Sequence, residues 1–371
     1  AVTVTPAGKL ESPTPAPLQP VQPVAAVSER PFSLAEVVNQ APTEKYAGLN
    51  VFLPFNLEKA QNIDVLADLT PAHLEQLEQN GFTLLQTQEE QFYEIRERVA
   101  IRHGQPYFLT TDAAYHALHL EFDALLKALE REHLRPQIIR ITQALLEEVL
   151  TYNRQVEGSS LAGDTALAVA YLAVALKLFD PQAILSPDLE KRIAPQMAQI
   201  TRAGGREKSA LFPAFEDDYG AYKPVGHYSG DPDLETYFQG MTWYGRVQFN
   251  FTEVGDLTYQ PGKEPLIIST ALRRAQIGNR PVYEDWLALH EILNFVIGPS
   301  DDPGPLALLA LMDQVYGVKP TLAALGDETL WNRFLTGASA LPSSQINSTF
   351  AASLDDLPKS RGWRFMGQRF T

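Results

Sequence analysis

The chain of 371 residues contains no cysteine, which excludes disulfide bonds, thiol nucleophiles and cysteine metal ligands. It is also poor in positive charge, because 30 lysine and arginine residues face 45 acidic residues and leave a formal net charge of −15. A protein that grips a nucleic-acid backbone needs clustered positive charge, so this imbalance argues against nucleic-acid binding.

Long apolar runs and familiar catalytic motifs are missing as well. The longest apolar run, residues 166–179, is interrupted by Lys177 and predicts a buried helix, so no membrane-spanning segment is expected. The sequence has no Gly-rich phosphate loop, no dinucleotide fingerprint and no Gly-x-Ser-x-Gly elbow. No reaction can therefore be assigned from a motif.

Proline is concentrated at the start of the chain. Residues 1–30 contain six prolines and no aromatic residue, a composition that cannot bury enough surface to fold and that predicts a disordered Pro/Thr/Ala-rich tether. An alanine ahead of such a tract is what signal-peptide cleavage leaves, so an extracellular or cell-envelope location is expected. Residues 31–371 are predicted to form one mostly helical domain.

Apolar residues recur at helical spacing through most of that domain. The pattern is clear in residues 137–156, 161–179 and 187–202, and again in residues 266–277 and 282–297. The predicted fold is mainly α, a multi-helix layered domain with at most a few short strands.

Residues 112–129 carry the most informative pattern. They contain no Gly, no Pro and no β-branched residue, so a helix is locally favoured. At about 100° per residue, His116, His119 and Asp123 fall within about 40° of Asp112, beside an apolar stripe that is expected to face the core. The spacing predicts four hydrogen-bonding side chains in one interior niche.

Such a stripe has three interpretations, because buried polar groups must be paired. Asp112 and Asp123 could orient His116 and His119 in a structural network. The four side chains could instead hold a divalent metal ion of unknown identity, or act as an acid/base pair in a cleft.

Two loops could add to this site or form others. Residues 215–228 are rich in Tyr and acids, and Asp217, Asp218, His227 and Tyr228 are candidate contributors to a metal-dependent hydrolase. A glycan-binding module would instead use surface aromatic residues, and the candidates for that role are Tyr219, Tyr222, Tyr228 and Trp243.

An acidic turn supplies a further, weaker candidate. Asp301 and Asp302 precede a predicted helix, where they could cap the helix or ligate a cation through their oxygens. The last residues, 361–371, mix large apolar side chains with cations and are expected to dock on this domain or on another chain.

Five stretches together resemble a bacterial and archaeal family of secreted proteins, the domain of unknown function 3160: residues 108–126, 222–228, 237–246, 297–302 and 362–371. The resemblance implies no activity, so no catalytic residue carries over. Family members continue past the Met-Gly-Gln-Arg-Phe-Thr segment, which implies that this chain is the N-terminal part of a longer fold. The expected role is a secreted or surface binding and assembly component, packed against another polypeptide such as the C-terminal half of its own precursor.

Overall fold

A computed structural model describes residues 53–54, 56–59, 69–84, 86, 94, 97–98, 101, 111–251, 261–300, 302–344 and 361–369. Contacts divide the chain into two compact units, Ala1–Glu90 and Gln91–Thr371, and each is described by itself. The tether predicted for residues 1–30 lies outside the described residues.

The first unit contains a short 3₁₀ turn, η1 (Leu57–Lys59), and helix α2 (Pro71–Asn80). Thr70 begins α2 with a capping box, in which its hydroxyl accepts from the His73 N–H at 3.3 Å and the His73 ring accepts from the Thr70 N–H at 3.1 Å. Gly81 ends the helix in the left-handed conformation (φ 76°), which glycine adopts without strain.

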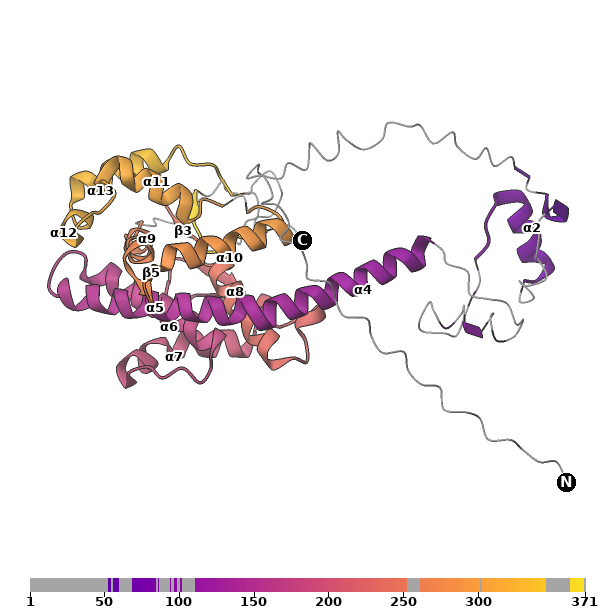
Figure 1. Cartoon of the computed structure of the whole chain (residues 1–371), viewed down its shortest axis with the longest axis horizontal. Helices are drawn as coiled ribbons and strands as arrows, with labels where there is room; N and C mark the ends of the chain where they lie inside the picture. Colours follow the sequence, from indigo (N-terminus) through magenta and orange to yellow (C-terminus); the bar gives the residue numbers. More distant parts are fainter. Residues whose placement is uncertain are drawn as a thin grey trace, which may run out of the picture. The chain divides into compact units, whose positions relative to one another are not determined.

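The second unit is built around α6 (Ala162–Phe179). Its apolar residues cover the whole circumference, so 12 of its 18 residues are buried. It packs against α5 (Arg135–Gln155), α7 (Pro187–Arg202), α8 (Pro232–Arg246) and α9 (Glu264–Arg274) (Figure 1). By length and composition α6 could also cross a membrane, but 67% of its residues are buried within the protein, as in the central helix of a folded domain.

The remaining elements are helices and very short strands. The helices are α4 (Thr111–Leu129), α10 (Val282–Val296), α11 (Pro305–Tyr316), α12 (Leu322–Leu325) and α13 (Glu328–Ala338). The strands of the described residues pair antiparallel in three two-stranded sheets: β1 (Arg206–Lys208) with β2 (Glu216–Asp218), β3 (Phe249–Asn250) with β6 (Gly362–Trp363), and β4 (Gln276–Ile277) with β5 (Arg280–Pro281). The prediction of a mainly α fold with few short strands is confirmed.

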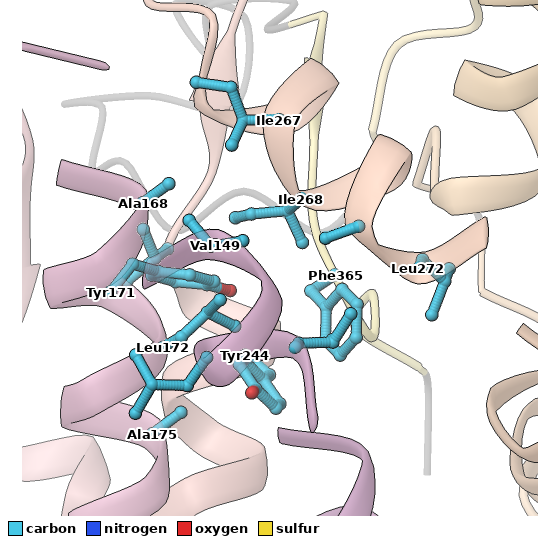
Figure 2. Close-up of a cluster of buried hydrophobic side chains, with 14 of the residues drawn as sticks. Val149, Ala168, Tyr171, Leu172, Ala175, Tyr244, Ile267, Ile268, Leu272 and Phe365 are labelled. Atoms are coloured by element: carbon cyan, nitrogen blue, oxygen red, sulfur yellow. The ribbon is translucent and has the colours of Figure 1, made fainter. Parts of the chain in front are cut away.

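Aromatic side chains from distant segments complete the core. Tyr171 of α6, Tyr244 of α8 and Phe365 lie together with aliphatic side chains of α5 and α9 (Figure 2). The rings of Tyr244 and Phe365 are 4.6 Å apart between centroids, and both side chains are fully buried. Phe365 follows β6, so the pairing of β3 with β6 draws this late segment into the centre of the unit. The expectation that the C-terminal residues dock is confirmed for residues 361–369.

Helices α6 and α8 approach closely at a glycine. A Cβ atom placed on Gly240 would lie 2.4 Å from the ring of Phe179, so only glycine fits there. This contact explains why a residue that weakens a helix stands in the middle of α8.

Candidate functional site

Helix α4 forms where the sequence predicts it, but the described residues leave it uncovered. It continues through a π-helical turn, η3 (Glu130–Leu134), into α5 as one long rod (Figure 1). None of its 19 residues is buried. Tyr115 is 73% exposed, Leu118 65% and Leu125 59%, so the apolar stripe faces outward.

The side chains of the polar stripe of α4 share one face of the helix, as predicted, but that face is not in the predicted interior environment. Asp112, His116 and His119 are exposed, and Asp123 is half-buried. The prediction of an interior niche is wrong for Asp112, His116 and His119, because no described element removes water from these three side chains. Among the described residues, no three His, Asp or Glu side chains are placed to hold a metal ion.

Asp123 joins a different group of side chains, at the junction of α4 with the Tyr-rich loop. One of its oxygens lies 2.9 Å from Lys127 Nζ, and the other lies 3.5 Å from His227 Nδ1. The hydrogen bond from Lys127 lowers the pKa of Asp123. The second nitrogen of His227, Nε2, lies 2.7 Å from Glu130 Oε2. The His227 ring therefore stands between two carboxylates.

Glu130 is the centre of this group. Its side chain is nearly fully buried, and the Tyr228 hydroxyl donates to its Oε1 at 2.9 Å. Burial raises the pKa of Glu130, and the hydrogen bonds from His227 and Tyr228 oppose that effect. A buried carboxyl that shares a hydrogen bond with an imidazole can hold or pass a proton.

The π-helical turn positions Glu130. In this turn the Arg135 N–H bonds to the Glu130 carbonyl, one residue further back than in an α-helix. Single π-helical turns inside α-helices are frequent at functional sites. His227 and Tyr228 come from η5 (Gly226–Tyr228), which contacts α4 and α8. Of the four loop candidates, His227 reaches Asp123 of α4, and Tyr228 reaches Glu130 of η3.

Asp217 and Asp218 have structural roles instead. Asp217 is buried, and it accepts hydrogen bonds from Arg246 Nε at 2.7 Å and from the Tyr222 hydroxyl at 2.9 Å. Asp218 accepts from the Gly220 N–H at 2.9 Å and caps the 3₁₀ turn η4 (Tyr219–Tyr222). The hydrogen bonds of both carboxylates stabilise the conformation of the loop, and neither carboxylate extends toward α4.

The acidic turn is likewise an anchor. The carboxylate of Asp302 forms an ion pair with Arg364, and both side chains are fully buried. Its second oxygen accepts from the Gln368 N–H at 2.7 Å. Both oxygens of Asp302 therefore hold the segment after β6, and the cation-binding interpretation of this turn stays a prediction. Asp301 lies outside the described residues.

The aromatic residues proposed for a glycan site are mostly core residues. Tyr219 and Tyr222 are fully buried and stacked, with ring centroids 5.8 Å apart, and Trp243 is 1% exposed. Buried rings offer no face to a sugar, so only Tyr228 of that set borders solvent-accessible space.

Glu130 is the residue that sequence reasoning missed. It follows Asp123 by seven residues, a spacing that returns to nearly the same helix face, and this could have flagged it. What the sequence could not show is that η5 would place His227 between them.

Comparison with known proteins gives one match. The family model described as a protein of unknown function, DUF3160, matches residues 70–371. The searches of curated proteins and of solved structures return no match.

Proposed function

The chain belongs to the DUF3160 family, whose function is unknown, and on that premise we propose that it is a binding and assembly component that docks another polypeptide on α4. One observation supports the proposal: α4 is a 19-residue helix without a buried side chain, although it carries a continuous apolar stripe. Large exposed apolar patches on folded proteins mark interaction sites.

The stripe has the geometry of a helix-docking surface. Tyr115, Leu118, Phe122 and Leu125 follow at intervals of three, four and three residues, so they share one side of the helix. Phe122 is 44% exposed and the others more than half. An amphipathic helix with this spacing fits a groove or a second helix, in which each apolar side chain enters a gap between partner side chains.

The polar residues of α4 favour a protein partner over a lipid surface. Helices that lie on membranes carry Lys and Arg on their polar side, which attract anionic headgroups. Apart from Lys127, the charged side chains of α4 are the acids Asp112, Glu121 and Asp123. Anionic lipid would repel this side, whereas a protein can supply complementary cations.

A photo-crosslinking amino acid placed at Leu118, in the full chain expressed in its native cells, tests the proposal. We expect a discrete adduct with one polypeptide, and none when the same group replaces the exposed His116, which lies about 160° around the helix from Leu118. The purified partner should then bind the chain in solution and lose affinity for the Leu118→Glu variant by about tenfold or more, since one buried leucine contributes at least about 1.4 kcal/mol. An adduct with a second copy of the chain would identify a homo-oligomer. Absence of any adduct at Leu118, or equal adducts at both positions, would contradict the proposal.

A further inference from the structure

A pocket of about 460 Å³ opens beside Glu130, between α8, the end of α10 and the segment after β6. This size lies within the range of about 300–1,000 Å³ that is usual for small-molecule sites. The α4 stripe contributes nothing to it, so the pocket stands apart from the docking surface.

One side of the pocket is apolar. Phe238 and Met241 of α8 line it, together with Leu293 of α10 and Ile297, the residue just after that helix. These four side chains can bury the body of an organic ligand but cannot distinguish its polar groups. The specificity must come from the remaining wall.

Arg369 brings a positive charge to that wall, and the described residues give its guanidinium no carboxylate as a hydrogen-bond partner. Its guanidinium donates to the Gly298 carbonyl at 3.0 Å, the Met366 carbonyl at 2.8 Å and the Asn294 side chain at 3.0 Å, all of which are neutral acceptors. Within the described part of the chain, no carboxylate lies within ion-pair distance of it. Burial lowers the pKa of Arg369, as expected for a cation removed from water.

The other charges around the pocket have partners of their own. Arg246 holds Asp217, Arg364 holds Asp302, and Glu130 bonds to His227 and Tyr228. Because the described hydrogen bonds of Arg369 go only to neutral acceptors, an anion that reached its guanidinium would offset the cost of burying the charge.

A second polar group of the wall lacks a partner. The side-chain oxygen Oε1 of Gln368, next to Arg369, is buried and accepts no hydrogen bond from the described residues. A buried acceptor left unsatisfied costs free energy, which a ligand hydroxyl or amine would recover.

We infer that this pocket binds a small organic carboxylate with an apolar body and one hydrogen-bond donor. The carboxylate lies toward Arg369, the body lies between Met241 and Leu293, and the donor bonds to Gln368 Oε1. The guanidinium exchanges its longer bonds, to the Gly367 carbonyl at 3.4 Å and to His290 Nδ1 at 3.3 Å, for the ligand oxygens.

Three matched probes test the inference with the full chain by isothermal titration calorimetry and ligand-observed NMR. The probes are para-hydroxyphenylacetate, phenylacetate, which lacks the donor, and para-hydroxyphenylacetamide, which lacks the charge. We expect the first to bind, and each of the others to bind about tenfold more weakly, which corresponds to about 1.4 kcal/mol for each lost interaction.

Variants then assign the contacts. Met241→Trp fills the pocket and should abolish binding, while Ile184→Thr, at a 95% exposed position elsewhere, should leave it unchanged. Gln368→Leu should remove the preference for para-hydroxyphenylacetate over phenylacetate. Arg369→Gln should remove the preference for para-hydroxyphenylacetate over para-hydroxyphenylacetamide. If the Arg369→Gln variant does not fold, the comparison of the three probes on the parent chain and the loss of binding in Met241→Trp still test the inference. Failure of both acids to bind, equal binding of acid and amide, or binding that survives Met241→Trp would overturn the inference.

Discussion

Glu264 is a buried carboxyl whose oxygen Oε2 has no hydrogen-bond partner among the described residues. Burial, with a smaller contribution from nearby Asp164, raises its pKa from 4.5 to about 8. Between those values the folded chain keeps a proton that the unfolded chain has released. The contribution of Glu264 to the free energy of unfolding should therefore fall by roughly 1.4 kcal/mol per pH unit as pH rises through this window.

The Glu264→Gln variant should lose this dependence, because an amide does not titrate. Urea unfolding at several pH values between the two pKa values, followed by tryptophan fluorescence, measures it. The exposed Glu216→Gln variant is the control and should keep the slope of the parent. An unchanged slope in Glu264→Gln would show that Glu264 is ionised in the folded chain.

His290 has the opposite effect on stability. Burial, with Arg369 nearby, lowers its pKa from 6.5 to about 4. As pH falls through this window the unfolded chain takes up a proton that the folded chain refuses, so stability is lost toward acid. In His290→Gln we expect a smaller loss of unfolding free energy between these two pH values, measured by the same urea titration. A parallel loss in variant and parent would exclude the imidazole as its source.

At the scale of single residues, the sequence predicts which face of a helix a side chain occupies better than it predicts whether that face is buried. Helical spacing places Asp112, His116, His119 and Asp123 on one face of α4, as observed, because phase depends only on the helix itself. Whether that face is covered depends on other elements, and the described residues leave it open. The contact of Asp123 with His227 likewise depends on the path of a loop 104 residues further along the chain (227 − 123), which no local pattern encodes.

At the scale of elements, the contact between α6 and α8 permits a sharp comparison of two glycines in one helix. Gly240→Ala forces a methyl group into the buried Phe179 ring and should destabilise the protein by about 1–3 kcal/mol. Gly245→Ala meets its nearest atom, Cγ of Gln368, at 3.6 Å, an ordinary contact, so it should be neutral or stabilise by up to about 1 kcal/mol. The denaturant midpoints of the two variants measure this difference in stability, and equal shifts of the midpoint would contradict the observed packing.

The anchor of the segment after β6 is a second prediction at this scale. Asp302→Asn leaves Arg364 buried without its counter-charge and should cost about 3–5 kcal/mol of unfolding free energy. The pair of Arg202, which is exposed, and Glu207, which is half-exposed, is the matched comparison, and Glu207→Gln should cost far less because water screens that pair. Chemical unfolding of both variants measures the difference, and similar losses would refute the role of Asp302.

Helices could be predicted from the sequence more fully than strands. α2 is bounded by Thr70 and Gly81, both visible as local signals, and α6 by its apolar run. The strands have two or three residues each, too few to show alternation. The pairing of Phe249 with Trp363 joins segments far apart in the chain, so it follows from packing rather than from local sequence.

At the scale of the whole molecule, the exposed stripe of α4 should change how the purified chain behaves. A dye that fluoresces on apolar surfaces should bind the native chain, and the double variant Leu118→Glu and Phe122→Glu should bind less of it. The melting temperature should stay nearly constant, because no side chain of α4 is buried. A large drop in melting temperature would instead mean that the stripe packs inside the chain.

The docking of Trp363 and Phe365 also bears on how the protein is made. These fully buried rings come from β6 and the residues just after it, whereas their neighbours in α5, α6 and α8 leave the ribosome much earlier. Until that segment has been synthesised, the nascent chain carries a gap in its centre and an unpaired β3. Emergence of that segment from the ribosome, rather than emergence of the helices, should therefore set the moment at which this unit reaches its final stability.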